Sequence, residues 1–396
     1  MIRISRWLPF LPFVLGSCLS AQGAPTALSI GTWNLEFLGA EGDFRNKLPL
    51  RDDADYEKIG QKVRALGVAV LAVQEICGEA PLRKVAAAAG PSWQVLLGTS
   101  GGWDDGKTSQ QIGFLYDAAV VDLLQAEELL ALPREQEGVP IFHRVPVSAC
   151  FRWKATGFDF RAITVHLKAG QKAPDETKRR LEATLLHGWI TDLQRATGED
   201  QDIVVLGDFN STYGTEPQQA LERGGSLQYL QPAAPTPTIM HFPEPIDQVA
   251  VAPAFDELGR TSFTVHGGFD GMAKDAWRKT YSDHFPVTVT ITAANDTDPA
   301  ATFRAAAPEG KLPASRRVVS NGGNAAPQRA SQTPPGWWPP KVGSQVTVVY
   351  GPTGTLSASG RLLQEVPMGP GGWIVVEIHG TPSAIPYSQV VRLQGL

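Results

Sequence analysis

The sequence contains few cysteines and has no excess of positive charge. It has 3 cysteines among 396 residues, and its 35 Lys and Arg residues are outnumbered by 40 Asp and Glu residues. A framework of several disulfides is therefore excluded. A strongly basic surface of the kind that coats polyanions is excluded as well. A local anion site built from a few basic residues or bound cations remains compatible with the net charge of −5.

Long hydrophobic runs are absent beyond the N-terminal segment. The mature chain is therefore expected to be soluble, or tethered from one end, with no transmembrane helix. At the N-terminus, Arg3 and Arg6 precede an apolar run over residues 7–19, and small residues follow at 21–23. This pattern predicts an export signal over residues 1–23 and disfavours a buried N-terminal helix.

The export signal contains a second pattern. Leu15-Gly16-Ser17-Cys18 resembles the lipobox of bacterial lipoproteins, in which the cysteine carries lipid. Secretion, a periplasmic location and lipid anchoring at Cys18 therefore remain alternatives. Cys77 and Cys150 are the other cysteines, and the sequence is equally compatible with one disulfide between them and with two buried thiols.

Residues 27–292 alternate short β-rich runs with helical stretches, which predicts a large α/β domain. Strands are expected at 29–37, 69–74, 93–97, 112–116, 146–153, 160–166, 203–207, 248–251 and 286–292, and helices at 56–66, 81–89, 175–193 and 216–223. So many strands favour two packed sheets covered by helices over a single sheet.

The C-terminal part of the chain changes character twice. Residues 293–340 are rich in Ala, Pro, Asn, Gly, Ser and Thr and lack apolar periodicity, which predicts a disordered linker. Residues 341–396 return to short β-rich runs between Gly and Pro turns, which predicts a small all-β barrel of the SH3-like kind. Its expected partner is an unidentified protein or a cell-surface component, because such a fold alone selects no ligand.

A buried strand that ends in polar residues is predicted near residue 208. The apolar run 203–206 precedes Gly207-Asp208-Phe209-Asn210. Strand side chains alternate, so Asp208 and Asn210 point to one side and Phe209 to the other. The two polar residues are candidate site residues at the carboxyl end of a strand, although Asp and Asn are also common in turns.

A carboxylate and an imidazole stand together before the last strand of the large domain. Asp283 offers a hard oxygen ligand for Mg²⁺ or Ca²⁺, and His284 offers a group that titrates near neutral pH. Hydrolysis of a phosphodiester requires both charge neutralisation and proton transfer. The pair therefore suits that chemistry, although an isolated Asp-His pair is more often structural.

Other segments also place polar residues at the ends of apolar strands. They contribute Asn34 with Glu36, Glu75, His166 and Asp247. Each of these is more often structural than catalytic when taken singly.

In chain order, these segments resemble the endonuclease/exonuclease/phosphatase superfamily, which includes deoxyribonuclease I, exonuclease III-type repair nucleases, sphingomyelinases and inositol polyphosphate phosphatases. The resemblance covers residues 30–290 and rests on Trp33-Asn34, Gln74-Glu75, His166-Leu167, Gly207-Asp208-Phe209-Asn210, Asp247 and Ser282-Asp283-His284. It implies a deoxyribonuclease I-like α+β sandwich of two packed sheets flanked by helices. It also implies a divalent cation, with Mg²⁺ as the expected ion and Mn²⁺ or Ca²⁺ as alternatives.

The resemblance also implies roles for individual residues. Glu75 corresponds to the principal metal ligand, with Asn34 beside it and Asp283 as a further acid on the metal side. Asp208 and Asn210 correspond to the pair that orients the attacking water and binds the phosphate. Glu36 is an additional, weaker candidate for metal contact.

The two histidines are expected to contact the phosphate. His284 resembles the imidazole at the scissile group, and Asp247 the acid that holds it in the useful tautomer. His166 resembles the second imidazole of the deoxyribonuclease I and sphingomyelinase branches, which points away from abasic-site repair. The sequence departs from that branch at Gln110 and Gln111, where an acid would support His166, so the orientation of His166 by a carboxylate is in doubt.

Basic residues near the site are candidate phosphate contacts. Arg144 corresponds to a phosphate-contacting arginine of the deoxyribonuclease-like branch, and an ordinary surface arginine is the equally weighted alternative. Lys168 begins a basic stretch with Lys172, Lys178, Arg179 and Arg180, for which a solvated helix start is the slightly favoured interpretation.

The expected function is that of an exported, metal-dependent phosphodiesterase, with an endonuclease acting on DNA or RNA as the leading form. A sphingomyelinase-like phospholipid phosphodiesterase is the first alternative, for which Trp103 is the modest candidate lipid contact. An inactive surface-binding module is the second alternative.

Overall fold

The computed structural model describes residues 27–39, 50–101, 110–136, 139–234, 236–259, 262–292 and 302–313, and five strands between residues 345 and 395. The chain divides into two compact units, Met1–Ser320 and Asn321–Leu396, which are described separately below. The predicted export signal, Cys18 and Trp103 lie outside the described residues. Among the helices that the structure describes, none is long and apolar enough to cross a membrane.

The first unit contains two six-stranded sheets. The first sheet has the order β13-β14-β1-β2-β4-β3, formed by Thr264–Val265, Val287–Ile291, Leu28–Leu38, Val70–Ile76, Gln111–Asp117 and Trp93–Leu97. The second has the order β11-β12-β10-β9-β8-β5, formed by Gln228–Leu230, Asp247–Val251, Ile203–Asp208, Asp159–His166, Val147–Trp153 and Val121–Glu128. A short hairpin pairs β6 (Glu135–Gln136) with β7 (Val139–Pro140).

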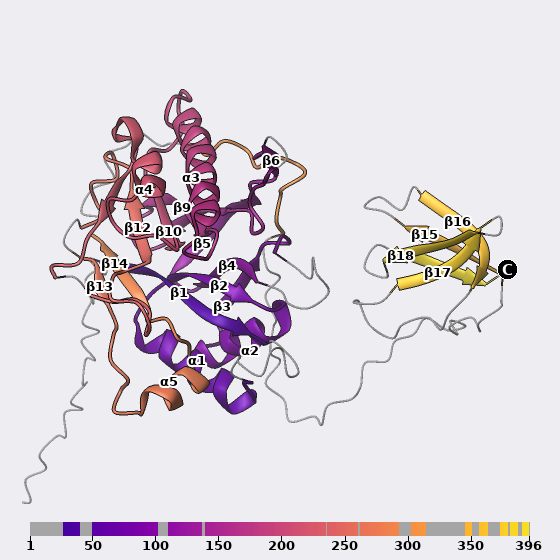
Figure 1. Ribbon diagram of the computed structural model, residues 1–396, viewed down its shortest axis with the longest axis horizontal. Helices are drawn as coiled ribbons and strands as arrows, with labels where there is room; N and C mark the ends of the chain where they lie inside the picture. Colours follow the sequence, from indigo (N-terminus) through magenta and orange to yellow (C-terminus); the bar gives the residue numbers. More distant parts are fainter. Residues whose placement is uncertain are drawn as a thin grey trace, which may run out of the picture. The chain divides into compact units, whose positions relative to one another are not determined.

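Helices cover the outer face of each sheet, so the unit has four layers (Figure 1). The helices α1 (Asp53–Ala65) and α2 (Glu79–Ala89) lie on the first sheet, with α5 (Lys274–Thr280) nearby. The helix α3 (Ala173–Gln194) lies on the second sheet, and α4 (Glu216–Leu221) packs beside α3. The predicted sandwich of two packed sheets flanked by helices is confirmed.

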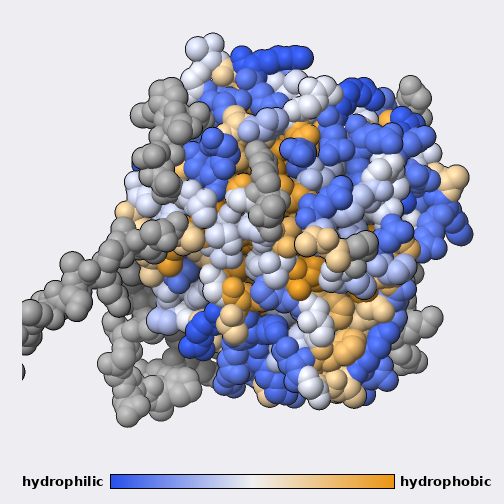
Figure 2. Space-filling view, turned by 90° about the vertical axis from the view of Figure 1, so that its left-hand side faces the viewer, coloured by the Kyte–Doolittle hydropathy of each residue, from blue (hydrophilic) through white to orange (hydrophobic). Residues whose placement is uncertain are grey.

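The central strands are apolar on both sides because each sheet is buried on both faces. In β10, Val204 and Leu206 face the core between the sheets, whereas Ile203 and Val205 face the core beneath α3. Burial on both faces therefore accounts for the continuous hydrophobic runs that the sequence shows at the centre of each sheet. Figure 2 views the side where β13 and β14 lie: hydrophobic residues gather near its centre, and hydrophilic residues cover most of its margin.

The direction of the central strands brings their polar ends together. The strand β1 runs parallel to β2, and β9 runs parallel to β10. The strands β12 and β14 are antiparallel to these neighbours, so their first residues lie at the same edge as the carboxyl ends of the parallel strands. One edge of the sandwich therefore collects the polar residues that follow or precede the apolar runs.

Gly207 is required by the close approach of β9 and β10. Its φ is +152°, and a Cβ at this position would lie 2.1 Å from the carbonyl oxygen of Val165. Any larger residue would push the two strands apart. The glycine of the Gly-Asp-Phe-Asn segment thus lets β9 and β10 end side by side.

The expected elements of the first unit occur, with ends shifted by a few residues, but α5, β5 and the short strands β6, β7, β11 and β13 were missed. The β5 sequence, with Leu, Gln, Ala and Glu in succession, has the composition of a helix. It forms a strand because it pairs with β8 along one side.

The sequence was equally compatible with a disulfide between Cys77 and Cys150 and with two free thiols. In the structure these two cysteines do not form a disulfide.

Residues 293–340 were predicted to form a disordered linker, but residues 302–313 are ordered in the structure. This segment lies along the free edge of β5. Leu312 donates its backbone N–H to the carbonyl of Ala126 at 3.0 Å, and Glu128 donates its backbone N–H to the carbonyl of Gly310 at 2.8 Å. The Leu312 side chain is 8% exposed and belongs to the core between the sheets. Covering an open strand edge satisfies its backbone groups, which explains why a segment without apolar periodicity is ordered. The remaining parts of the predicted linker lie outside the described residues.

The second unit contains a five-stranded antiparallel sheet in the order β18-β17-β16-β15-β19. Its strands are Thr381–Pro386, Trp373–Ile378, Leu356–Leu362, Gln345–Tyr350 and Val390–Gly395. This all-β content agrees with the expected class, and the SH3-like identity and its partner stay predictions.

Candidate active site

The ends of three neighbouring strands bring His166, Asp208 and Asp247 into register. Asp208, the last residue of β10, pairs with His166 at the end of β9 and with Asp247 at the start of β12. All three side chains are buried. Asn210 follows with a φ of +49°, in the left-handed region that asparagine adopts more readily than most residues.

Hydrogen bonds hold the Asp208 carboxylate from both sides. Its Oδ2 accepts from Nδ2 of Asn34 at 3.0 Å, and its Oδ1 accepts from the backbone N–H of Asn210 at 2.9 Å. Asn210 in turn donates from Nδ2 to the carbonyl of Leu167 at 3.1 Å. Asn34 therefore links the first sheet to the acid at the end of the second sheet.

Asp208 is buried and Glu75 is largely buried, with a 14% exposed side chain, and imidazoles lie within 4 Å of both acids. Burial, together with the charge of Asp283, raises the pKa of Glu75 from 4.5 to about 7. Burial and the charge of Asp247 raise the pKa of Asp208 from 3.8 to about 6. Such crowding of carboxylates is costly unless a cation shares the site.

His284 forms a buried pair with Asp247. Its Nδ1 lies 2.8 Å from Oδ2 of Asp247, and its Nε2 faces Asp208 at 3.9 Å and Asp283 at 3.8 Å. Burial lowers the pKa of His284, but the charge and hydrogen bond of Asp247, with the charges of Asp208 and Asp283, outweigh it and raise the pKa well above its ordinary value. The surrounding carboxylates therefore favour the protonated form of His284.

The surroundings of His166 shift its pKa in the opposite direction from that of His284. Its Nε2 lies 3.7 Å from Oε1 of Glu75 and 3.5 Å from Oδ2 of Asp208, yet its Nδ1 has no hydrogen-bond partner among the described residues. Burial, followed by the charges of Arg144 and His284, lowers the pKa of His166 well below its ordinary value. Burial therefore favours the neutral form of this imidazole.

The serine before the Asp-His pair orders the loop that carries it, a role that sequence reasoning missed. Ser282 donates from Oγ to the carbonyl of Asn34 at 2.7 Å and accepts from the backbone N–H of His284 at 3.0 Å. The indole of Trp33 donates to the carbonyl of His284 at 3.0 Å. A small hydroxyl residue two positions before a candidate histidine was the signal available in the sequence.

Glu36 is engaged by basic and backbone groups. It forms ion pairs with Arg278 and Arg51, and its Oε2 accepts from the backbone N–H of Asp283 at 3.0 Å. The guanidinium of Arg51 also donates to the carbonyls of Leu35 and Glu36, both at 2.8 Å. Glu36 thus anchors the loop of Asp283, and Arg51 and Arg278 are two further residues that sequence reasoning missed.

The side chain of Arg144 is buried and donates hydrogen bonds to three groups. Its Nε donates to the carbonyl of His166 at 3.0 Å, its Nη2 donates to the carbonyl of Leu167 at 3.0 Å, and its Nη1 donates to the side chain of Gln110 at 2.7 Å. The surface alternative is excluded because Arg144 is 7% exposed. Lys168 is paired with Asp175 at 2.9 Å, which reduces its availability for a phosphate.

The acidic residues fit a divalent cation. Asp208, Asp247 and His284 have potential ligand atoms within 4.8 Å of one another. Asp247 and His284 are, however, joined by a hydrogen bond, which a metal bound to both would break. The acids Glu75 and Asp283, with the oxygen of Asn34, form the more suitable oxygen-rich set for a hard cation.

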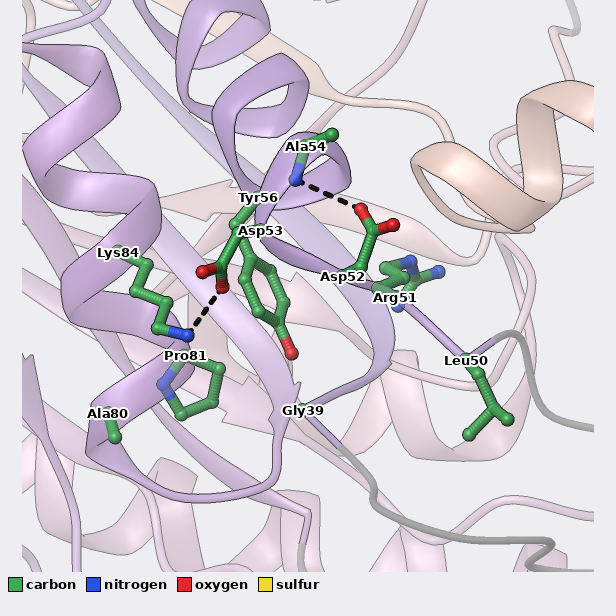
Figure 3. A pocket seen from close by; sticks show the side chains of 10 residues that line it. All are labelled: Gly39, Leu50, Arg51, Asp52, Asp53, Ala54, Tyr56, Ala80, Pro81 and Lys84. Atoms are coloured by element: carbon green, nitrogen blue, oxygen red, sulfur yellow. Dashed lines mark hydrogen bonds and ion pairs between the residues drawn. The ribbon is translucent and has the colours of Figure 1, made fainter.

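Asn210 also lines a pocket of about 510 Å³. A different pocket, of about 640 Å³, lies at the starts of α1 and α2 (Figure 3). None of the expected site residues lines this second pocket, and its Lys84 is paired with Asp53. The expected site residues therefore lie at the edge where β9 and β10 end.

Comparison with known proteins agrees with this geometry. A model of the endonuclease/exonuclease/phosphatase family matches residues 31–284, which is more than half of the chain. The chain belongs to this family. Members of the endonuclease/exonuclease/phosphatase family are hydrolases that act on phosphoester bonds. A comparison with curated protein sequences gave no match.

Solved structures resemble the family domain in fold. An endonuclease/exonuclease/phosphatase from Bacteroides vulgatus is 20% identical and covers 67% of this chain and 99% of its own, with a TM-score of 0.50. The human Nocturnin catalytic domain with bound sulfate is 14% identical and covers 67% of this chain and 94% of its own, with a TM-score of 0.49. A Bacteroides thetaiotaomicron mannosyl-6-phosphatase is 22% identical and covers 66% of this chain and 98% of its own, with a TM-score of 0.45.

Proposed function

We propose that this member of the endonuclease/exonuclease/phosphatase family is an exported, metal-dependent endonuclease that hydrolyses phosphodiester bonds of DNA or RNA. The observation that carries the proposal is the grouping of Glu75, Asp208 and Asp283 with His284 at one edge of the sandwich. Carboxylates for a cation and an imidazolium for a phosphoryl oxygen are what phosphodiester hydrolysis needs.

Glu75, Asp283 and Asn34 would hold the cation. Bound there, Mg²⁺ supplies neutralisation of the charge on the phosphoryl oxygens. The positive φ of Glu75, +59°, supports this role, because strained backbone is often found where a side chain must be aimed at a ligand. The protein's own contribution is a rigid set of oxygens from β1, β2 and the loop before β14.

Asp208 is the proposed base that orients the attacking water. Its two hydrogen bonds, from Asn34 and Asn210, hold the carboxylate in one orientation. Its pKa of about 6 lets it be ionised at neutral pH and still accept a proton during attack. Asn210 keeps one amide hydrogen for a phosphoryl oxygen after it donates to Leu167.

The two imidazoles would act in different charge states. His284, held by Asp247, stays protonated and donates from Nε2 to the negative charge that develops on the phosphoryl group. His166, neutral because its pKa is depressed, contributes a single N–H without adding charge. A pair of titratable groups whose pKa values are driven apart is typical of hydrolytic sites.

Neither alternative has a supporting observation in the described residues. The lipid-contact candidate of the sphingomyelinase-like alternative, Trp103, lies outside them. The inactive-module alternative is disfavoured because the candidate catalytic groups are present and adjacent.

The test is a substrate panel of plasmid DNA, RNA, a phosphocholine lipid and an inositol phosphate, incubated with the full chain and Mg²⁺. We expect cleavage of nucleic acid, complete inhibition by EDTA, and recovery on addition of Mg²⁺ or Mn²⁺. Release of phosphocholine without nucleic acid cleavage would contradict the proposal. Export is tested separately, by locating the intact chain and its Cys18→Ala variant after cell fractionation.

A further inference from the structure

A buried carboxylate stands at the same edge of the sandwich as the candidate active site. Glu128 is the last residue of β5 and pairs with Val147 at the start of β8. Val147 in turn pairs with Thr164, two residues before His166 at the end of β9. Glu128 is 1% exposed, and among the described residues its carboxylate bonds only to the loop after β3. This acid therefore lies at the catalytic edge without a part in the proposed reaction.

The carboxylate of Glu128 holds the loop that follows β3. Its Oε2 accepts from the backbone N–H of Thr99 at 2.9 Å and from Oγ1 of Thr99 at 2.6 Å. Its Oε1 accepts from the backbone N–H of Ser100 at 2.7 Å. Hydrogen bonds to a charged acceptor are stronger than those between neutral groups. The three donors on two successive residues therefore fix this loop to the end of β5.

The segment 302–313 holds the backbone of Glu128 from the other side. Glu128 donates its backbone N–H to the carbonyl of Gly310 at 2.8 Å. A Cβ on Gly310 would collide with the carbonyl oxygen of Glu128, so the segment packs closely on the end of β5. The family model matches residues 31–284, so this anchor lies outside the part of the chain that defines the family.

The loop after β3 also packs against Arg144. The Oγ of Ser100 accepts from the backbone N–H of Val145 at 2.7 Å. Gly101 lies so close to Arg144 that a Cβ on the glycine would be 2.7 Å from Cγ of the arginine. The carbonyl of Gly101 accepts from the backbone N–H of Gln110 at 2.7 Å, and Oε1 of Gln110 accepts from Nη1 of Arg144. The position of Arg144 therefore depends on this loop.

Arg144 contacts the backbone beside two candidate catalytic residues. Its Nε donates to the carbonyl of His166, and its Nη2 donates to the carbonyl of Leu167. The same carbonyl of Leu167 accepts from Nδ2 of Asn210 at 3.1 Å. A displacement of Arg144 would therefore affect His166 and Asn210 together.

We propose that Glu128 is a positioning residue, which sets the places of His166 and Asn210 through the loop after β3 and Arg144, an inference that rests on the proposed hydrolytic function. A misplacement of about 1 Å can lower the rate of a catalytic step by about a hundredfold. A carboxylate suits this role because its two oxygens accept from all three donors. An amide of the same size has one oxygen and one NH₂ group, so it would face a donor with a donor.

The test compares Glu128→Gln with Glu127→Gln, its neighbour in β5. Glu127 is 3% exposed, accepts from the backbone N–H of Ala307 at 2.9 Å, and lies 3.9 Å from Nη1 of Arg161. Each full-length variant is assayed with Mg²⁺ on the panel substrate that the wild type cleaves fastest. Both should have a lower melting temperature, because both lose buried hydrogen bonds. Only Glu128→Gln should lose turnover, by about tenfold to a hundredfold with little change in KM. Equal turnover in the two variants would overturn the proposal.

A double variant tests whether Glu128 acts through Arg144. If it does, the rate losses of Glu128→Gln and Arg144→Lys should not multiply, and the double variant should be as slow as Arg144→Lys alone. Two independent structural effects would instead multiply, and that result would contradict the dependence on Arg144.

The exposed residue Thr99 replaces Glu128 in the test if Glu128→Gln does not fold. Thr99→Val removes the hydroxyl that donates to Glu128 and should lower turnover, whereas Thr99→Ser keeps a hydroxyl and should cleave like the wild type. The same turnover in both variants would count against the positioning role.

A measurement without substrate separates this inference from the proposed function. The ring proton signals of His166, assigned by their absence in His166→Gln, should shift in metal-free Glu128→Gln and stay in place in Glu127→Gln. Wild-type protein that cleaves no nucleic acid contradicts the nuclease function and leaves this measurement intact. Unchanged His166 signals in Glu128→Gln would overturn the positioning role, whatever the substrate.

Discussion

His284 and Asp247 form a buried pair in which Nδ1 of the imidazole lies 2.8 Å from Oδ2 of the carboxylate. The pair joins the loop before β14 in the first sheet to the start of β12 in the second. Asp247 fixes the orientation of the His284 ring, since an imidazolium that donates from Nδ1 to a carboxylate presents its Nε2–H to the substrate. The orientation of His284 therefore depends on contact between the two sheets.

The Asp247→Asn variant should lower the turnover number by about tenfold to a hundredfold, the usual effect of losing an orienting carboxylate. Loss of the negative charge also lowers the pKa of His284, so the alkaline limb of the pH–rate profile should move to lower pH. The exposed acid Glu244 provides the control variant Glu244→Gln. An unchanged rate and profile in Asp247→Asn would contradict the role given to the pair.

Glu75 makes the stability of the metal-free protein depend on pH. Its pKa is raised from 4.5 to about 7, so the folded state disfavours the ionised form. This group is neutral in both states below pH 4.5 and destabilises the fold progressively as pH rises to 7, by about 3 kcal/mol. In EDTA, wild-type protein should lose stability over this range by urea denaturation, and Glu75→Gln should lose less, with the remaining loss coming from the raised pKa of Asp208.

Saturating Mg²⁺ should reverse that loss, because a cation stabilises the ionised carboxylates in the folded state. The gain in melting temperature should be larger at pH 8 than at pH 5.5, and it should be small in Glu75→Gln. Equal gains at both pH values, or in both proteins, would show that Mg²⁺ binds elsewhere.

Arg144 should act by positioning the end of β9. A lysine ammonium cannot direct its N–H groups at the three separated acceptors that the planar guanidinium of Arg144 reaches. Arg144→Lys should therefore lose about 2 kcal/mol of stability, and its turnover number should fall with little change in KM. Arg180→Lys, at a surface site with a 43% exposed side chain, is the control. The phosphate-contact role predicts the reverse pattern in Arg144→Lys, a raised KM with stability intact.

Residues 302–313 should be part of the stable domain. Leu312→Ala removes a side chain from the core between the sheets and should cost about 2 kcal/mol or more. Lys311→Ala, next to it in the same segment, changes an exposed side chain and should have little effect on unfolding by urea. Equal, small effects would indicate that the segment does not contribute to the core.

The location of the site was predictable because its residues stand where apolar runs end. Asp208 and His166 each follow a strand that is buried on both faces, and parallel strands bring such ends together. The two packed sheets were predictable for the same reason, since the number of such runs exceeds what one sheet holds. Local sequence was sufficient to predict an element wherever burial alone determines its pattern of apolar residues.

Other features depend on contacts between distant segments. In the sequence, nothing distinguishes Arg144 from other arginines in loops. Only the fold shows that its guanidinium donates hydrogen bonds to the carbonyls of His166 and Leu167. The anchoring of Glu36 by Arg51 and Arg278 joins residues from three elements and has no local signature. Propensity also misdirects at β5, where the partner strand overrides a helix-like composition.

The most direct test of the account is the rate at which Asp208→Asn hydrolyses nucleic acid in saturating Mg²⁺. Asparagine keeps the size of the side chain but cannot accept the proton of the attacking water, so the rate should fall at least a hundredfold, the lower end of what a positioned proton acceptor contributes. The melting temperature in EDTA should not fall, because burial of the Asp208 charge disfavours folding. A folded Asp208→Asn protein with wild-type activity would contradict the proposed mechanism.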